Sequence, residues 1–167
     1  MSIFEKTVFM NVKDKTIWIT GASSGIGAAL ARAYSKSDAH LILSARNKEA
    51  LEAVRLSCAY PEKIKILELD LGNNSTLEHK VETAIQYYGR IDILINNAGI
   101  SQRSLVSETV IEVDRRIFEV NYFGTIALSR ALLPHFKENK RGHFVVISSV
   151  VGKIGTPLRS SYAASKH

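Results

Sequence analysis

The sequence predicts an α/β fold in which helices cover both faces of a parallel, doubly wound sheet. Five short segments rich in aliphatic and β-branched residues alternate along the 167 residues with segments of helical periodicity. These candidate strands lie at residues 16–20, 41–44, 65–69, 92–96 and 144–148. Runs such as LIL and FVVI are apolar throughout, as strands covered on both faces require. The length suits a single domain over residues 1–167.

The segments between the strands carry apolar residues at helical spacing. After the first strand these residues are Ile26, Ala29, Leu30, Ala33 and Tyr34, and after the third they are Leu77, Val81, Ile85 and Tyr88. Asn47 is the predicted N-cap of the helix that follows the second strand. Residues 107–139 predict a long helix with a break near Asn121 and Gly124, because both residue types disfavour a helix interior.

The charge balance excludes little by itself. Lys and Arg number 22 against 16 Asp and Glu, and the net charge of +6 suits either an anionic ligand or a solvated surface. The densest basic run, residues 137–141, lacks interleaved aromatic residues. We therefore expect it to end a helix rather than to bind nucleic acid.

Cysteine usage and hydropathy indicate a soluble, cytoplasmic protein. A single cysteine, Cys58, excludes an intrachain disulfide, and we expect it on the apolar face of a helix. No His/Cys cluster has metal-ligand spacing, so we expect no metal. Glu5 and Lys6 interrupt the apolar N-terminus, and no apolar run approaches the roughly 18 residues of a membrane span. We expect no membrane anchor.

Three glycines lie in the turn between the first strand and the first helix. Gly21, Gly25 and Gly27 have the spacing G-x-x-x-G-x-G, one residue longer before the helix than the common G-x-G-x-x-G fingerprint. Such a turn lets the backbone approach a pyrophosphate, whose charge the helix N-terminus then binds. The alternative is a tight strand-to-helix turn without a ligand.

The segment TGASSGIG resembles the cofactor loop of the short-chain dehydrogenases/reductases, and residues 96–99 resemble the family's NNAG element. The resemblance implies a Rossmann-like sheet of order 3-2-1-4-5, with the family's C-terminal strands missing after His167. It also implies that Asp70 contacts the adenine, although a strand-end Asp can be merely structural. The implied cofactor-binding residues in these segments are Gly21, Ser23, Ser24, Gly25, Ile26, Gly27, Asp70, Asn97, Ala98 and Gly99.

The end of the second strand favours NADP(H) over NAD. Nucleotide-binding folds specific for NAD place an acid there, about 20 residues after the glycines, to bond the ribose hydroxyls. This chain instead has Leu43-Ser44-Ala45-Arg46. Arg46 can pair with a 2′-phosphate that a carboxylate would repel. Arg46 could also be a solvated residue at the start of the next helix.

Tyr162 and Lys166 are four residues apart and share one face of a helix if this segment is helical. The pair alone is weak evidence, but it follows the fifth strand and its two terminal serines. Ser149 lies thirteen residues before Tyr162, the spacing at which the family carries its catalytic serine, and Ser148 is the competing neighbour. Asn121 matches the family's helix-interrupting asparagine. The resemblance implies the catalytic set Asn121, Ser149, Tyr162 and Lys166, with Tyr162 and Lys166 also contacting the cofactor.

This set suits the interconversion of a ketone or aldehyde with an alcohol. A carbonyl that accepts hydride must also receive a proton, and a phenol, with an ordinary pKa near 10, exchanges protons poorly at neutrality. An ammonium group beside the phenol would stabilise the phenolate. The resemblance implies that Ser149 binds the substrate oxygen and that Asn121 holds a water linking Lys166 to solvent.

The resemblance runs from Asn11 to Lys166 and is nearest to the branch that contains dehydrogenase/reductase member 7 and the 11-beta-hydroxysteroid dehydrogenases. We expect a small-molecule carbonyl or alcohol substrate and a homo-oligomer, because an uncovered fifth strand favours association. The alternative is an inactive cofactor-binding fragment that lacks the substrate segment. A sugar-nucleotide epimerase or dehydratase is less favoured, because those relatives have a shorter glycine spacing.

Overall fold

The computed structural model describes residues 12–167, so the expectations that concern Glu5, Lys6 and Asn11 lie outside the described residues. Residues 12–167 form a parallel five-stranded sheet of order β3-β2-β1-β4-β5, as predicted. Each strand lies within one or two residues of its predicted position. The strands are β1 (Thr16–Thr20), β2 (His40–Ala45), β3 (Ile64–Glu68), β4 (Ile93–Asn96) and β5 (His143–Val146).

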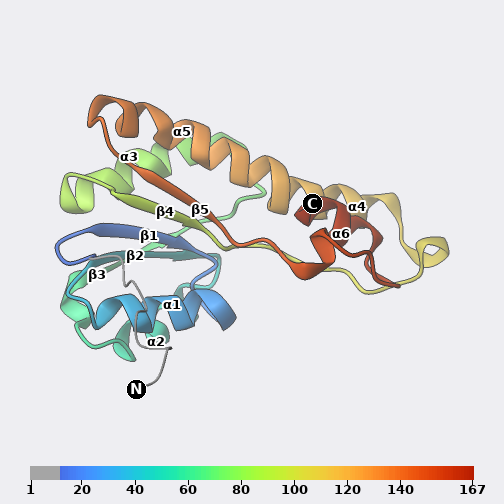
Figure 1. Cartoon of the computed structure of the whole chain (residues 1–167), viewed down its shortest axis with the longest axis horizontal. Helices are drawn as coiled ribbons and strands as arrows, with labels where there is room; N and C mark the ends of the chain where they lie inside the picture. Colours follow the sequence, from blue (N-terminus) through green and yellow to red (C-terminus); the bar gives the residue numbers. More distant parts are fainter. Residues whose placement is uncertain (1–11) are drawn as a thin grey trace, which may run out of the picture.

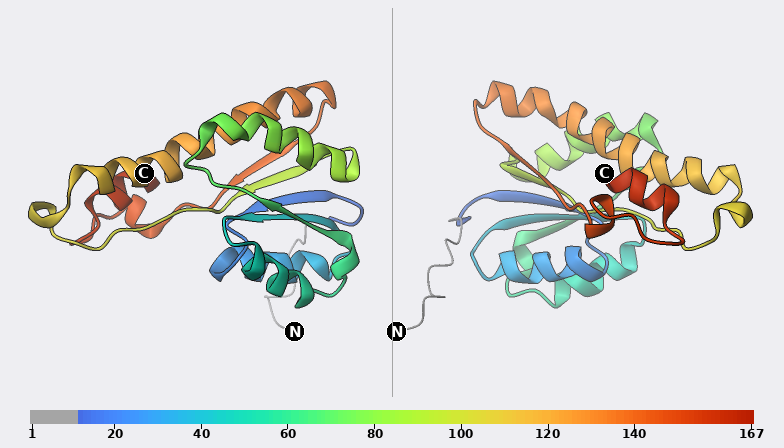
Figure 2. Two further views of the ribbon diagram at one scale, coloured as in Figure 1. Left: turned by 180° about the vertical axis from the view of Figure 1, so that it is seen from behind. Right: turned by 45° about the vertical axis from the view of Figure 1, so that its right-hand side comes forward.

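Helices cover both faces of the sheet (Figures 1 and 2). One face carries α1 (Gly25–Ser35) and α2 (Lys48–Leu56), and the other carries α3 (Leu77–Tyr88) and α5 (Gly124–Glu138). α4 (Ile111–Phe118) leads into α5, and the C-terminal α6 (Ser160–Lys166) packs on α4. Short 3₁₀ turns lie at Pro61–Lys63, Asn74–Thr76, Val106–Glu108 and Val150–Gly152.

Each face of the sheet has its own apolar core because side chains alternate along the strands. Ile17 and Ile19 of β1 face α1 and α2, whereas Trp18 faces α3 and α5; all three are fully buried. The Trp18 indole Nε1 donates to Ser44 Oγ at 2.8 Å, so its buried N–H is satisfied. Burial on both faces explains why β1 is apolar through its interior.

The buried face of α1 differs from the predicted one. Gly27, Ala28 and Ala31 are buried, whereas the predicted Ile26, Ala29 and Ala33 are exposed. Small side chains let α1 approach the sheet closely, and Ile26 instead points toward the cleft above it. Leu30 and Tyr34 are partly buried against the core, so only these two predicted residues contribute to it.

The break predicted near Asn121 and Gly124 is a π-helical turn, Glu119–Phe123. The helical direction continues through it, so α4, the π turn and α5 read as one long helix in Figure 1. A π turn widens the backbone, and such turns are frequent at functional sites. Asn121 is 7% exposed within this turn. The predicted position of the irregularity is confirmed, but its form is a π turn and not a break between two helices.

Cys58 is buried, but the prediction that it lies on the apolar face of a helix is wrong. It follows the C-cap residue Ser57 of α2, and its Sγ donates to the Val54 carbonyl at 3.3 Å.

The predicted N-cap Asn47 is confirmed, because its side chain accepts from the Ala50 N–H at 2.8 Å. The basic run begins in the last turn of α5, as expected. No helix within residues 12–167 is long and apolar enough to span a bilayer.

β5 is an edge strand. The N–H groups of His143 and Ile147 donate to carbonyls of the β4 side, and no strand among residues 12–167 pairs with the opposite edge. Phe144 and Val146 are 37% and 61% exposed there. The predicted uncovered apolar edge is therefore present in these residues.

Candidate active site

The main cavity lies at the carboxyl ends of β1 and β4, where the strand order reverses. Open α/β sheets bind ligands at this position. The cavity has a volume of about 820 Å³. Most of the predicted cofactor residues line it: Gly21, Ser23, Ser24, Ile26, Arg46, Asp70, Asn97, Ala98 and Gly99. Gly25 and Gly27 do not line it.

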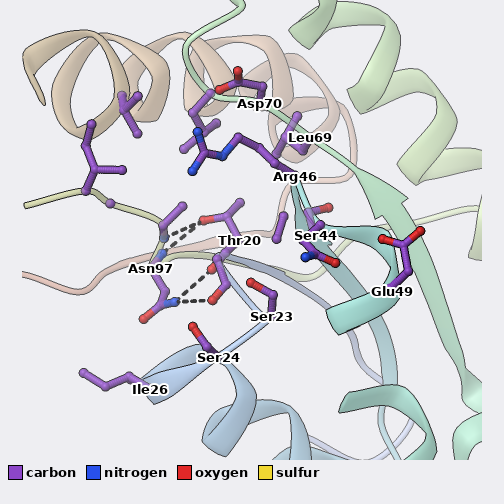
Figure 3. A pocket seen from close by; sticks show the side chains of 18 residues that line it. Thr20, Ser23, Ser24, Ile26, Ser44, Arg46, Glu49, Leu69, Asp70 and Asn97 are labelled. Carbon is purple, nitrogen blue, oxygen red and sulfur yellow. Dashed lines mark hydrogen bonds between the residues drawn. The ribbon is translucent and has the colours of Figure 1, made fainter. Parts of the chain in front are cut away.

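Hydrogen bonds join the glycine loop to the end of β4 (Figure 3). The Asn97 side-chain Nδ2 donates to the carbonyls of Thr20 and Gly21 at 3.0 and 3.1 Å. Thr20 Oγ1 accepts from the N–H groups of Asn97 and Ala98, both at 3.1 Å. These bonds fix the floor of the cavity, and Thr20 is a site residue that the sequence analysis missed.

The loop glycines allow this close approach. Gly21 has a φ of +65°, and a Cβ there would lie 2.7 Å from Ala98 Cα. A Cβ at Gly27 would lie 2.6 Å from Asn97 Nδ2. The Ser24 side chain makes no capping bond to α1. The first N–H groups of α1 therefore stay available beside the cavity, where an anion would be stabilised.

Arg46 and Asp70 lie at the opposite end of the cavity from Ser24 and Ile26 (Figure 3). Among residues 12–167, no hydrogen bond or ion pair holds the Arg46 guanidinium. Asp70 is engaged, because its carboxylate accepts from the Gly72 N–H at 2.8 Å and from Arg116 at 3.2 Å. Burial raises the pKa of Asp70, but the bonds from Gly72 and Arg116 and the positive charges of Arg116 and Arg46 outweigh it, so the net pKa is lowered. Asp70 therefore faces the cavity as a carboxylate already tied to α4.

A second, smaller cavity of about 160 Å³ adjoins the first and shares Ile26, Asn97, Gly99 and Ile100 with it. Its other lining residues are Ser101 from the loop after β4, Ile147 and Ser148 directly after β5, and Tyr162 and Lys166 from α6. The structure thus brings the predicted Tyr-Lys pair to one end of the cleft and Arg46 to the other.

Lys166 is held without an acidic partner among the described residues. Its Nζ donates to the Ile147 carbonyl at 3.1 Å, and a Cβ at Gly99 would lie 3.4 Å from Nζ. Burial lowers the pKa of Lys166, because desolvation disfavours the ammonium form. The glycine at position 99 leaves room for this ammonium group beside the end of β4.

Asn121 clamps the segment that carries Gly99. Its Oδ1 accepts from the Ile100 N–H at 2.8 Å, and its Nδ2 donates to the Ile100 carbonyl and to Ser165 Oγ, both at 2.9 Å. The side chain therefore holds the loop after β4 against α6 with both of its Nδ2 hydrogens and with Oδ1. The water-holding role implied for Asn121 stays a prediction.

The two serines after β5 occupy different places. Ser148 lines the smaller cavity, and its Oγ donates to the Lys166 carbonyl at 2.9 Å. Ser149 does not line it; its Oγ accepts from the Val151 N–H at 3.4 Å and caps the Val150–Gly152 turn. Side chains alternate along extended backbone, so the two hydroxyls point to opposite sides. The assignment of Ser149 rests on spacing alone and stays a prediction.

Replacing Lys166 by methionine should leave the protein at least as stable as the wild type. Since the folded-state pKa of Lys166 is lowered, the ammonium form opposes folding, and its penalty fades as the pH rises toward the ordinary lysine pKa. Methionine keeps most of the apolar length and removes the charge. Urea unfolding at neutral pH should give an equal or higher midpoint for Lys166→Met. The exposed control Lys153→Met should match the wild type, and a clear loss of stability in Lys166→Met alone would contradict this account.

Comparisons with known proteins agree with the fold and motifs. The short chain dehydrogenase family matches residues 15–167. Human "Dehydrogenase/reductase SDR family member 7" is 44% identical over 159 residues, covering 92% of this chain and 47% of that protein. The "Dehydrogenase/reductase SDR family protein 7-like" of Anopheles gambiae is 45% identical, covering 94% of this chain and 51% of that protein. The predicted likeness to member 7 is thus confirmed.

A solved structure shares the architecture. The crystal structure of a short-chain dehydrogenase from Streptomyces avermitilis superposes with a TM-score of 0.86 at 36% identity, covering 94% of this chain and 57% of that one. The chain spans about half the length of the curated relatives it matches. On its sequence match, its sheet order and the sequence of its motifs, the chain belongs to the short-chain dehydrogenase/reductase family.

Proposed function

We propose that this chain is the NADP(H)-binding part of an oxidoreductase that interconverts a ketone or aldehyde with an alcohol, with Tyr162 as general acid/base. One observation carries the proposal: the large cleft beside the glycine loop adjoins a small cavity lined by Tyr162 and Lys166. A ligand in the cleft would therefore reach an acid/base pair at one end.

The cleft fits a dinucleotide by its chemistry. Gly21 and Gly27 have no side chains that would keep the loop backbone away from a pyrophosphate, and the uncapped N–H groups of α1 would bind its charge. Arg46 has no ion-pair partner among the described residues and is suited to a 2′-phosphate. The nicotinamide would supply or accept the hydride.

The chain's own residues would transfer the proton and stabilise the charges that result. Tyr162 would donate a proton to the carbonyl oxygen of the substrate during reduction, and the Lys166 ammonium would stabilise the resulting phenolate. Ser148 or Ser149 would donate a hydrogen bond to that oxygen. Asn121 supports the arrangement by holding the loop after β4 against α6.

NAD remains the competing cofactor, and Glu49 is the observation that favours it. Glu49 in the first turn of α2 also lines the cleft, and a carboxylate there could bond ribose hydroxyls. Arg46 favours NADP(H), because an unpaired guanidinium gains most from a phosphate.

The experiment titrates the 167-residue chain with NADPH by cofactor fluorescence and then measures NADPH oxidation over a panel of ketones and aldehydes. Saturable binding with turnover supports the proposal. Binding without turnover favours the alternative, a cofactor-binding chain that lacks the substrate segment. The chain covers 47% of the human relative, which supports this alternative. Absence of NADPH binding would refute both.

The cytoplasmic location and the homo-oligomer are further proposals. The uncovered β5 edge, with Phe144 and Val146 exposed, supports association of the chain. Sedimentation velocity over a range of concentrations tests it, and a monomer throughout that range would contradict it.

A further inference from the structure

The Asp70 carboxylate at the cleft is held by a side chain from a distant segment. Its Oδ1 accepts from the Gly72 N–H at 2.8 Å, and its two oxygens accept from one guanidinium nitrogen of Arg116 at 3.3 and 3.2 Å. Among residues 12–167, no other side chain donates a hydrogen bond to this carboxylate. Arg116 lies on α4 and does not line the cleft. It would therefore affect the hydrogen bonds of a bound ligand through Asp70.

Gly72 makes room for the guanidinium. A Cβ at this position would clash with the end of the Arg116 side chain, so the guanidinium lies directly against the backbone of Gly72. The backbone itself does not require glycine here, because its φ is not in the left-handed region. The missing side chain therefore serves the approach of Arg116 to Asp70. Asn74 donates to Glu119 of the π turn, and this second contact holds the same segment against the long helix.

The ion pair of Asp70 and Arg116 adds little to stability. Both side chains are 40% exposed, and water screens ion pairs at such exposure. A carboxylate has about four lone-pair sites, so the bonds from Gly72 and Arg116 leave at least one for a donor of a ligand. Asp70 lies at the same end of the cleft as Arg46 (Figure 3). A fixed carboxylate with acceptor capacity is thus present where the adenosine half of a dinucleotide would lie.

We propose that Arg116 is a positioning residue that fixes the Asp70 carboxylate to accept a hydrogen bond from the amino group of a bound adenine, which makes the cleft selective for adenine. This role rests on the dinucleotide binding of the proposed function. Adenine is common to NADPH and NADH, so the role does not depend on which of them Arg46 selects. A carboxylate that is held in advance loses less conformational freedom on binding than one that rotates freely.

The test compares two cofactors that differ in one group. NADPH carries the adenine amino group, whereas deamino-NADPH carries an oxygen acceptor on the same carbon. The dissociation constants of both for the 167-residue chain are measured by cofactor fluorescence. The wild type should bind NADPH about tenfold more tightly, the effect of one hydrogen bond to a charged group. If the chain binds only NADH, the same ratio is measured with NADH and deamino-NADH.

Arg116→Met should reduce the ratio of the two dissociation constants to about threefold or less, because the carboxylate is no longer held in place. Arg116→Lys keeps a charged donor without the planar group and should give an intermediate ratio. Gly72→Ala keeps both charges, but its methyl group takes the place of the guanidinium. It should lower the ratio in the same direction as Arg116→Met.

Arg115→Met is the matched control, because Arg115 is the neighbouring, exposed cation on α4. It makes the same change in net charge and should keep the wild-type ratio, as expected for a solvent-screened charge. The urea-unfolding midpoint of each variant is measured alongside, so that a loss of folded protein is not mistaken for a loss of selectivity.

A double substitution separates an effect through Asp70 from a general one. Asp70→Ala alone should abolish the preference for NADPH over deamino-NADPH. Adding Arg116→Met to Asp70→Ala should then change neither dissociation constant by more than Arg115→Met does, because Arg116 has no carboxylate left to hold. A merely structural effect of Arg116 on the cleft would persist without Asp70.

The proposal is overturned if the wild type binds NADPH without preferring it to deamino-NADPH, or if both Arg116→Met and Gly72→Ala keep the wild-type ratio. An equal loss of selectivity in Arg115→Met, or an effect of Arg116→Met that persists in Asp70→Ala, also overturns it. In each of these cases dinucleotide binding itself stands. If the chain binds neither NADPH nor NADH, the proposed function fails and the role of Arg116 fails with it.

Discussion

Replacing Tyr162 by phenylalanine should lower kcat by about 10²–10⁴-fold and leave the dissociation constant of NADPH within about threefold of the wild type. Phenylalanine keeps the ring that lines the smaller cavity and that Arg159 covers, so the walls of the site persist. Only the hydroxyl that would exchange the proton is removed. The kcat of the wild type and of the variant is measured at saturating NADPH, and the dissociation constant of NADPH is measured separately by fluorescence.

Tyr60→Phe is the control for this substitution. Tyr60 lies after α2, 44% exposed and beside Lys63, and it lines neither cavity. It should change neither kcat nor binding. If Tyr162→Phe keeps more than about a third of the wild-type kcat, the proton comes from another group and the proposed mechanism is wrong.

Replacing Arg46 by aspartate should weaken NADPH binding by about a hundredfold, while NADH binding stays the same or improves. The change removes a charge-assisted hydrogen bond to the 2′-phosphate, worth about 1.5–3 kcal/mol, and places a repelling carboxylate nearby. Arg46 is exposed and makes no hydrogen bond or ion pair among residues 12–167, so its loss should not unfold the chain. The affinities of both cofactors are measured by fluorescence titration of each variant.

Lys48→Asp reverses a charge two residues away, on an exposed side chain that does not line the cleft. It should change the NADPH affinity by much less than Arg46→Asp, which separates a specific contact from a general change in net charge. If Arg46→Asp weakens the binding of NADPH and of NADH equally, Arg46 does not contact the 2′-phosphate. Glu49 would then be the residue to test for NAD binding.

The strands and the cofactor loop could be predicted because their signals are local. A strand such as β1 is buried on both faces, so its apolar run marks it directly. The turn from Gly21 to Gly27 needs residues without side chains where the loop meets Asn97, and only glycine satisfies that need. The four-residue spacing of Tyr162 and Lys166 likewise fixes a shared helix face.

The remaining features depend on contacts between distant segments. The face of α1 was misjudged because close packing of Gly27, Ala28 and Ala31 outweighed the larger Ile26, which borders the cleft. The side chain of Ser149 is drawn into capping a following turn, which spacing cannot reveal. Arg159 and Ser101 are 58 residues apart, so their contact exists only once α6 packs beside the loop after β4.

The contact of Asp70 with α4 is another one that local sequence does not predict. Its place at the end of β3 was predicted from a resemblance, but its bond to Arg116 on α4 spans 46 residues. That bond ties one end of the cleft to the long helix that carries Asn121. No pattern in the sequence joins Asp70 to Arg116, whereas the folded chain does.

A crystal structure of the 167-residue chain with NADPH tests the central claim most directly. We expect the pyrophosphate beside the N-terminus of α1, the 2′-phosphate within hydrogen-bond distance of Arg46, and the nicotinamide ring in the smaller cavity beside Tyr162 and Lys166. A dinucleotide bound with its adenosine end beside Tyr162, or with its 2′-phosphate far from Arg46, would contradict the account.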